Sequence, residues 1–267
     1  MAPRRLALVT GASAGIGAAL ARVYAAHGWD LALTARRADR QAQLADEIRT
    51  GFGVDVLVLP DDLADPAAPE RLLAALEGGG RTVDALVNNA GFSRTTGFAA
   101  TPAAEHQAML QVMLNAPVEL TRRALPGMLA RGYGRILNVA SVAGLLPATG
   151  GDTLYGPVKS FLVKASRGLW LETRGTGVHV TALCPGYTFS EFHDVNGSRA
   201  EVSAATPRWM WMSAEAVARS GYEAAEANRP VCVPGLANKA LVALMQVLPD
   251  DWTLRLVARH GERLKRL

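Results

Sequence analysis

The chain has 267 residues, 49% of them hydrophobic, so it can bury a large core, and we expect one domain over residues 1–267. No run of roughly 18 apolar residues is present to span a membrane, and the start of the chain lacks a secretory cleavage site. Two cysteines, Cys184 and Cys232, are too few for a disulfide framework or a zinc site, so we expect a cytoplasmic protein with no metal. The net charge of +4 comes from scattered arginines, which does not favour nucleic-acid binding.

Short apolar segments alternate along the chain with longer, alanine-rich segments. This alternation is typical of βαβ units, and strands that are apolar throughout are typical of a parallel sheet covered on both faces. The predicted strands are Leu6–Thr10, Asp30–Thr34, Asp55–Leu59, Ala85–Val87, Gly134–Val139, His179–Leu183 and Val231–Val233. The main predicted helices are Ile16–His27, Ala38–Thr50, Pro102–Arg131 and Tyr155–Gly175, with a further helix that stops at the glycine run 78–80.

Two stretches depart from this alternation. Residues 188–212 contain aromatic residues and methionines without a clear period, which is typical of a lid-like insertion that carries exposed apolar groups. Residues 236–267 are predicted to form a helical tail, with an apolar run followed by a basic amphipathic segment from Trp252. Such a segment could rest on an anionic membrane, but a docked or dimer-forming helix fits the pattern better.

A glycine-rich segment, residues 10–17, follows the first predicted strand and opens a helix. Its glycines, Gly11, Gly15 and Gly17, are spaced Gly-x-x-x-Gly-x-Gly, which departs from the commoner Gly-x-Gly-x-x-Gly pattern. A backbone without side chains can approach a pyrophosphate closely, and a helix N-terminus supplies N–H groups and a positive dipole end. We therefore interpret the segment as a dinucleotide-binding loop rather than as a tight turn alone.

The end of the second predicted strand indicates which dinucleotide binds. A site for NAD places an acidic residue there, which accepts a hydrogen bond from the ribose 2′-OH. This chain has Arg36 and Arg37 instead. A guanidinium pairs with the 2′-phosphate of NADP, whereas an aspartate would repel it. The sequence therefore predicts NADP(H), the alternative being that the two arginines only cap the approach to the next helix.

A tyrosine and a lysine have a spacing that suits proton transfer. Of the five tyrosines, only Tyr155 has a lysine four residues later, Lys159, which places both side chains on one face of a helix. The ammonium would lower the phenol pKa from its usual value of about 10. Carbonyl reduction needs such a proton donor, because hydride transfer leaves an alkoxide. Ser141, just after the fifth predicted strand, could hold the substrate oxygen beside the phenol.

Together with other short motifs, these features occur in a fixed order. The motifs are residues 10–17, Asp62-Leu63, Asn88 to Gly91, Asn115 in a long helix, Asn138 to Ser141, Tyr155 to Lys159, and Pro185-Gly186 with Thr188. Over roughly residues 5–235 they resemble the motif set of the short-chain dehydrogenase/reductase family, in a bacterial branch whose substrates are mostly unassigned. The resemblance implies a Rossmann-type, doubly wound parallel sheet of about seven strands in three α/β/α layers.

The resemblance also implies a catalytic tetrad: Asn115, Ser141, Tyr155 and Lys159. Tyr155 would be the acid/base, and Lys159 would tune it and hold the nicotinamide ribose. Ser141 would position the carbonyl, and Asn115 would anchor a water that links Lys159 to solvent. Two departures stand out: Ser141 lies further before Tyr155 than is usual in the family, and Pro157 requires the helix to begin within a residue or two of Tyr155.

The cofactor contacts that the resemblance implies lie along most of the chain. Asp62 and Leu63 would flank the adenine, and the segment around Pro185 would hold the nicotinamide end. The full set is Gly11, Ser13, Gly15, Ile16, Gly17, Arg36, Arg37, Asp62, Leu63, Asn89, Ala90, Gly91, Tyr155, Lys159, Pro185, Gly186 and Thr188.

Large apolar side chains in residues 188–212, among them Phe189 and Trp209, favour an apolar carbonyl or alcohol such as an acyl chain, a steroid or an aromatic ketone. The alternative is ordinary packing of this segment, or a subunit contact. His193 could meet substrate, although a lone loop histidine is more often solvated. By resemblance we expect a homodimer or homotetramer that uses the helices 102–131 and 155–175.

Three functions compete. The leading one is NADP(H)-dependent interconversion of a carbonyl and an alcohol on an apolar small molecule. The alternative is a catalytically silent NADP-binding sensor or interaction protein, since a fold does not guarantee its chemistry, although an intact tetrad argues against it. Epimerisation or dehydration of a nucleotide sugar belongs to longer chains with a larger C-terminal domain.

Overall fold

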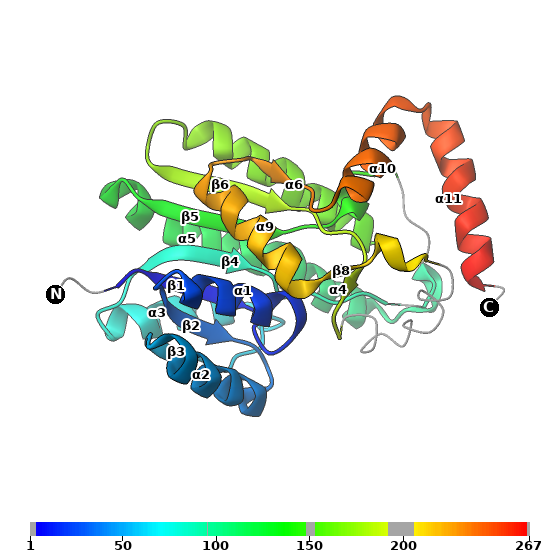
Figure 1. Ribbon diagram of the computed structural model, residues 1–267. Helices are drawn as coiled ribbons and strands as arrows, with labels where there is room; N and C mark the ends of the chain where they lie inside the picture. Colours follow the sequence, from blue (N-terminus) through cyan, green and yellow to red (C-terminus); the bar gives the residue numbers. More distant parts are fainter. Residues whose placement is uncertain (1–3, 95, 148–152, 192–205, 266–267) are drawn as a thin grey trace.

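A seven-stranded parallel sheet forms the centre of the molecule in the computed structural model, which describes residues 4–94, 96–147, 153–191 and 206–265 (Figure 1). The strand order is β3-β2-β1-β4-β5-β6-β9. The order reverses between β1 and β4, which is where doubly wound sheets open a ligand crevice at the carboxyl ends of their strands. The strands are β1 Leu6–Thr10, β2 Asp30–Thr34, β3 Val56–Val58, β4 Val83–Asn88, β5 Gly134–Val139, β6 Val178–Leu183 and β9 Val231–Cys232.

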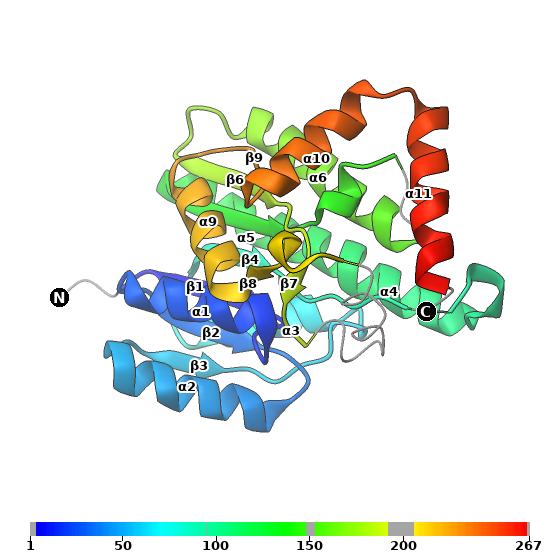
Figure 2. The ribbon, with the colours of Figure 1, turned by 45° about the vertical axis from the view of Figure 1, so that its right-hand side comes forward.

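Helices cover both faces of this sheet (Figures 1 and 2). Apolar residues of α1, α2 and α9 form one core cluster with the sheet, and those of α3, α5 and α6 form another on the opposite face. The helices are α1 Gly15–Ala26, α2 Ala38–Phe52, α3 Ala68–Gly78, α4 Ala103–Leu110, α5 Ala116–Arg131, α6 Tyr155–Glu172, α9 Ala214–Glu226, α10 Leu236–Val247 and α11 Asp250–Lys265.

The first strand shows why the strands are apolar throughout. Successive side chains of a strand point to opposite faces. Ala7 and Val9 lie in the cluster under α1, α2 and α9, while Leu6 and Leu8 lie in the cluster under α3, α5 and α6. All seven predicted strands are confirmed to within two residues at either end, and the three-layer Rossmann-type fold is confirmed with them.

The long helix predicted over Pro102–Arg131 is wrong in one respect. It consists of α4 and α5 with a π-helical turn, Gln111–Asn115, between them. Pro117 follows this turn in the first residues of α5. Proline has no N–H to donate and its ring clashes with the carbonyl four residues earlier, so regular α-helical bonding is interrupted there. The predicted start of the next helix is confirmed, because α6 begins at Tyr155.

The C-terminal tail forms two helices, α10 and α11, and α11 lies at the periphery of the molecule in both views (Figures 1 and 2). Trp252 and Leu254 on α11 are exposed, while Thr253 between them is buried. Within the described part of the chain, no helix has the length and apolar character needed to cross a bilayer. In the predicted lid, residues 188–191 and 206–212 are described, whereas His193 lies outside the described residues.

Candidate functional site

The turn after β1 is tied to the end of β4 by two polar side chains. The hydroxyl of Thr10 donates to the carbonyl oxygen of Val87 at 3.1 Å and accepts from the N–H groups of Asn89 and Ala90 at 2.9 and 3.0 Å. In return, the amide nitrogen of Asn89 donates to the carbonyl oxygens of Thr10 and Gly11 at 2.9 and 3.2 Å. The predicted contacts Asn89 and Ala90 therefore lie directly beside the glycine loop.

Backbone conformation or close packing explains why glycine occupies each of the three glycine positions of the loop. Gly11 and Gly15 have φ angles of 65° and 55°, in the left-handed region that glycine adopts without strain. A Cβ on Gly17 would collide with the carbonyl oxygen of Gly11. The helix α1 begins here with no capping side chain and no carboxylate in its first turn. Its N-terminal N–H groups and dipole therefore suit an anion such as a pyrophosphate.

At the end of β2, the two predicted arginines behave differently. Arg37 donates from Nε and Nη2 to the hydroxyl of Ser13 at 3.3 and 3.0 Å, so the predicted contacts Arg37 and Ser13 are neighbours. Arg36 is exposed and has no hydrogen bond or ion pair with other described residues. Arg37 also pairs with Glu191, as does Arg40. Glu191 lies 154 residues from Arg37, so no local pattern predicts their contact, whereas Arg40 follows Arg37 within the first turn of α2 and its position was a signal that could have been used.

Asp62 and Leu63, predicted to flank the adenine, and the other predicted cofactor contacts Ile16 and Gly91 follow strands whose carboxyl ends lie at the same edge of the sheet. Leu63 is buried in an apolar cluster, whereas Asp62 is exposed and its carboxylate accepts from the backbone N–H of Ala64 at 3.0 Å. Ile16 packs against the core, partly buried. Gly91 is exposed, and a Cβ there would lie 3.4 Å from the side chain of a buried methionine.

Lys159 is the most deeply placed of the predicted catalytic residues. Its side chain is buried, and Nζ donates to the carbonyl oxygen of Val139, the last residue of β5, at 2.7 Å. The same ammonium lies 5.5 Å from the centre of the Tyr155 ring. Burial lowers the pKa of Lys159 from 10.5 to about 8, because desolvation penalises the charged form. Tyr155 and Lys159 therefore share one face of α6, as predicted from their spacing.

Ser141 joins this pair from the end of β5. It precedes the short helix 142–144, and its hydroxyl accepts from the N–H of Ala143 at 3.1 Å. A Cβ on Gly144 would lie 2.5 Å from the backbone of Lys159, so this helix packs directly on α6. The hydroxyl of Ser141 also donates to the carbonyl oxygen of Pro185 at 3.4 Å. These contacts place Ser141 beside α6, the helix that carries Tyr155 and Lys159.

The residues predicted to contact the nicotinamide end lie in the segment after β6. Pro185 accepts from Ser141 as described, and Gly186 is required because a Cβ there would collide with the buried side chain of Asn238. Thr188 is buried, and its hydroxyl donates to the carbonyl oxygen of Gly186 at 3.0 Å. Ser190 was not predicted, yet a Cβ on the loop glycine Gly15 would lie 2.9 Å from its Cβ.

A buried network of hydrogen bonds joins the carboxyl ends of β4 and β5 to the helices α5 and α6. Asn88 and Asn138 are paired in register on β4 and β5, and the amide of Asn88 donates to the side-chain oxygen of Asn138 at 2.8 Å. Asn88 also donates to Thr121 on α5, and Asn138 donates to Ser166 on α6 at 2.9 Å. The two strand ends that carry the site are therefore fixed to the helices below them.

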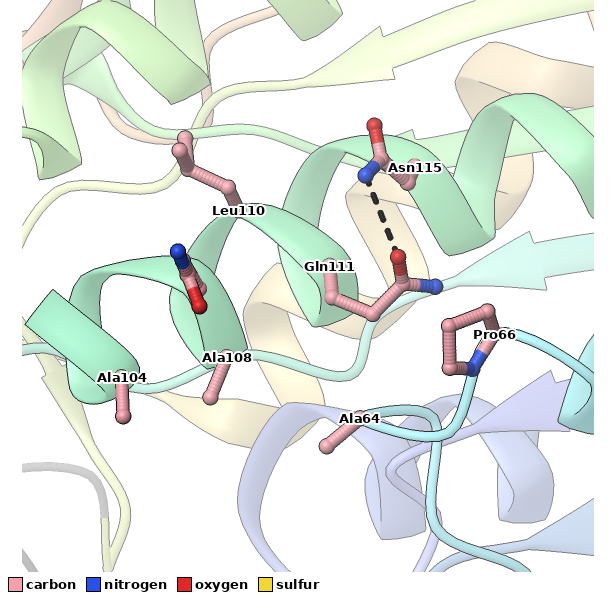
Figure 3. A pocket seen from close by; sticks show the side chains of 8 residues that line it. Ala64, Pro66, Ala104, Ala108, Leu110, Gln111 and Asn115 are labelled. Carbon is pink, nitrogen blue, oxygen red and sulfur yellow. Dashed lines mark hydrogen bonds between the residues drawn. The ribbon is translucent and has the colours of Figure 1, made fainter.

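Asn115 does not join the other three members of the predicted tetrad. Its side chain is exposed, and its amide donates to the side-chain oxygen of Gln111 at 3.1 Å (Figure 3). Both residues line a surface pocket with Ala64, Pro66, Ala104, Gln107, Ala108 and Leu110 (Figure 3).

The residue two positions earlier explains this placement. Met113 is buried in the apolar cluster against which Tyr155 packs, and two positions along a helix point to nearly opposite sides. The assignment of Asn115 to the tetrad is therefore corrected: the π-helical turn directs Met113 inward and Asn115 outward.

We expect Asn115→Ala to leave kcat within about twofold of the wild type, because the side chain makes its hydrogen bond on the helix surface. Steady-state kinetics on any carbonyl that the protein reduces, run beside Ser141→Ala as a positive control, would test this. A fall in kcat for Asn115→Ala comparable to that of the control would restore Asn115 to the catalytic set.

Burial of Lys159 predicts a specific pH dependence of stability. Between about pH 8 and 10.5, the unfolded chain holds this proton more tightly than the folded protein, so the contribution of Lys159 to the free energy of unfolding rises with pH. Lys159→Met keeps the length of the side chain and removes the titration. The stability of the variant relative to the wild type should therefore decrease by on the order of 2 kcal/mol from pH 7.5 to 10, as urea denaturation of the cofactor-free proteins can measure. A difference independent of pH would show that Lys159 titrates normally.

Comparison with known proteins agrees with this geometry. The family model described as short chain dehydrogenase matches residues 5–200. A serine 3-dehydrogenase of Agrobacterium fabrum is 38% identical over 187 residues, which cover 69% of this chain and 72% of the relative. An NADP-dependent 3-hydroxy acid dehydrogenase of Salmonella typhi is 37% identical over 182 residues, covering 68% and 71%.

Solved structures give the same result. A short-chain dehydrogenase from Sphingobium yanoikuyae in complex with NADPH superposes with a TM-score of 0.79 at 30% identity, covering 92% of this chain and 96% of that one. A 7beta-hydroxysteroid dehydrogenase superposes with a TM-score of 0.85 at 25% identity, covering 95% and 96%. On the family match, the sequence relatives and the fold together, this chain belongs to the short-chain dehydrogenase family.

Proposed function

We propose that the protein is an NADP(H)-dependent oxidoreductase that interconverts a carbonyl and an alcohol on an apolar small molecule. The observation that carries the proposal is the grouping of Ser141, Tyr155 and Lys159, with the Lys159 ammonium buried between the end of β5 and the Tyr155 ring. A buried ammonium beside a phenol is an arrangement for proton transfer rather than for stability, because burial of a charge costs free energy.

The three side chains divide the work by their chemistry. In the direction of reduction, the Ser141 hydroxyl would turn from the carbonyl oxygen of Pro185 and donate, with Tyr155, to the carbonyl oxygen of the substrate, and Tyr155 would then transfer its proton to that oxygen. The phenolate left behind is stabilised by the positive charge of Lys159 and recovers a proton from solvent. Bound NADPH supplies the hydride, and the alcohol oxidation runs the same steps in reverse with NADP as the acceptor.

The residues around the crevice fit this cofactor. The uncapped start of α1 and the glycine loop suit a pyrophosphate, and Ser13 with Arg37 forms a donor set that suits a phosphate monoester. Support also comes from the relatives, several of which are named NADP-dependent, and from the solved neighbour with NADPH. Arg36 would reach the same phosphate from its exposed position at the end of β2.

The substrate class rests on aromatic side chains beside the nicotinamide end. Phe189 is 48% exposed and stacks on the buried ring of Trp211 with 5.0 Å between ring centres. Trp209 is 71% exposed. Water-exposed aromatic faces next to a ligand crevice favour an apolar partner. The solved neighbours named for a steroid and for bulky ketones support this class, whereas the names of the sequence relatives refer to serine and 3-hydroxy acids.

One observation favours the alternative of a catalytically silent NADP-binding protein. Asn115, which was expected to link Lys159 to solvent through a water, faces the outside. A protein of this kind would bind NADPH without oxidising it.

The experiment that separates the two functions measures NADPH and NADH oxidation by the purified protein against bulky and aromatic ketones, aldehydes and 3-oxoacyl thioesters. L-Serine and 3-hydroxy acids with NADP test the polar class in the oxidative direction. Turnover of apolar carbonyls that prefers NADPH supports the proposal. Turnover confined to the polar substrates would refute the substrate class, and NADPH binding without any turnover would favour the silent protein.

A further inference from the structure

A carboxylate of the chain itself lies between the arginines at the end of β2. One oxygen of Glu191 accepts from Arg37 Nη1 at 3.0 Å, and the other accepts from Arg40 Nη1. Arg37 meanwhile uses Nε and Nη2 to donate to the hydroxyl of Ser13. Two guanidinium groups and one hydroxyl therefore surround a single anion, and that anion is a side chain.

This cluster has the composition of a site for a phosphate monoester. Guanidinium groups pair in bidentate fashion with phosphate as well as with carboxylate. Arg37 and Arg40 carry two positive charges against the single negative charge of Glu191. A phosphate monoester carries about −1.5 to −2 at neutral pH and offers three acceptor oxygens, so it would match the two arginines more fully than the carboxylate does.

Glu191 belongs to the segment after β6, which also contains the residues predicted to contact the nicotinamide end. Glu191 follows β7, Thr188–Phe189, which leads away from Pro185 and Gly186 at the nicotinamide end. Its neighbour Ser190 packs on the loop glycine Gly15. The chain therefore passes the glycine loop at Ser190 and places the Glu191 carboxylate on the guanidinium groups of Arg37 and Arg40.

The ion pairs of Glu191 with Arg37 and Arg40 are weak enough for another anion to replace the carboxylate. The hydrogen bond from Arg40 and the contact with Arg37 lower the pKa of Glu191, so the carboxylate stays charged at neutral pH. All three side chains are nevertheless about two-fifths exposed, at 39%, 42% and 39% for Arg37, Arg40 and Glu191. Ion pairs exposed to this degree are weak, because water screens them. A dianion that enters the crevice can therefore replace the carboxylate.

We propose that Glu191 is an internal competitor for the 2′-phosphate and so a residue that sets cofactor preference. When NADP(H) binds, its 2′-phosphate takes the place of the Glu191 carboxylate on Arg37 and Arg40. NAD(H) has no group to displace it and leaves these ion pairs intact. The preference for NADP(H) is consequently smaller than the two arginines alone would give. This inference rests on the proposed function for the identity of the dinucleotide.

The test is a fluorescence titration of the full-length protein with NADPH and NADH, and a calorimetric titration with adenosine 2′,5′-bisphosphate and AMP. Glu191→Gln removes the charge and keeps the shape of the side chain. We expect it to bind NADPH and the bisphosphate about fivefold more tightly than the wild type, with NADH and AMP within twofold. Asp39→Asn is the matched control, because Asp39 is an exposed carboxylate on the first turn of α2 that pairs with no described residue.

Each outcome decides between explanations. Equal tightening by Asp39→Asn would show a general effect of charge and overturn the proposal. NADPH binding that Glu191→Gln leaves unchanged or weakens would also overturn it, and a selective loss of NADH binding would show that Glu191 holds ribose hydroxyls instead. Selective tightening in a protein that turns over no carbonyl would uphold the competition and refute the proposed chemistry. A wild-type protein that binds neither NADPH nor the bisphosphate would refute both.

Discussion

Tyr155→Phe is expected to lower kcat for carbonyl reduction by about 10²- to 10⁴-fold while leaving the dissociation constant for NADPH within about twofold. The substitution removes only the hydroxyl, so the alkoxide formed by hydride transfer has no proton donor at hand. The ring itself remains, and it is the ring that packs on the apolar cluster with Met113 and lies over Lys159. Single-turnover NADPH oxidation and NADPH fluorescence titration measure the two quantities separately.

Tyr133→Phe is the matched control for this prediction. Tyr133 lies just before β5, at the opposite end of that strand from Ser141, and contacts the guanidinium groups of Arg5 and Arg135. Loss of its hydroxyl should leave kcat unchanged. A Tyr155→Phe variant that retained more than about a tenth of the wild-type kcat would mean that another group donates the proton. A parallel loss of NADPH affinity would place the main role of Tyr155 in binding.

Gly17→Ala is expected to have the largest effect on the cofactor crevice. The added Cβ would collide with the carbonyl oxygen of Gly11 and lie 2.5 Å from the amide nitrogen of Asn89, so the glycine loop and the start of α1 must move apart. Strain of this kind typically costs about 1 to 3 kcal/mol of stability. The displaced N–H groups should also weaken NADPH binding by more than about tenfold. Thermal unfolding and NADPH titration measure both effects.

Gly51→Ala provides the matched comparison. Gly51 is an exposed glycine of α2, and a Cβ there would meet no atom within 4 Å. Alanine is the better helix former, so this variant should gain about 0.5 to 1 kcal/mol of stability with unchanged NADPH binding. A Gly17→Ala protein that behaved like Gly51→Ala would show that the loop can relax and that its glycine is dispensable.

The predicted lid, residues 188–212, lies only partly within the family match. Trp209 and Phe189 are exposed, and the family match ends at residue 200, which is after Phe189 but before Trp209 and the helices α9 to α11. Trp209, one of the two exposed aromatic side chains on which the substrate class rests, therefore lies outside the family match. A substrate screen is for this reason more informative than the names of those relatives.

The amino-acid sequence alone determined the strands and most of the helices, since these depend on local hydrophobic periods and on glycine and proline signals. The bounds of β1, β2 and β5 match the predicted ones. The glycine loop and the Tyr155–Lys159 pair were also accessible, because each lies within one turn or one helix and its geometry follows from spacing.

Only the tertiary structure decided which side chains from distant segments meet. Asn115 was assigned from the resemblance, and only the folded chain shows that Met113 lies buried in the cluster with Tyr155 while Asn115 is exposed on the other side of the helix. Glu191 reaches Arg37 across 154 residues, and the pKa of Lys159 falls to about 8 only because the folded chain buries its ammonium. Local sequence fixes local geometry, whereas ion pairs and pKa shifts arise from burial and neighbours that exist only once the chain has folded.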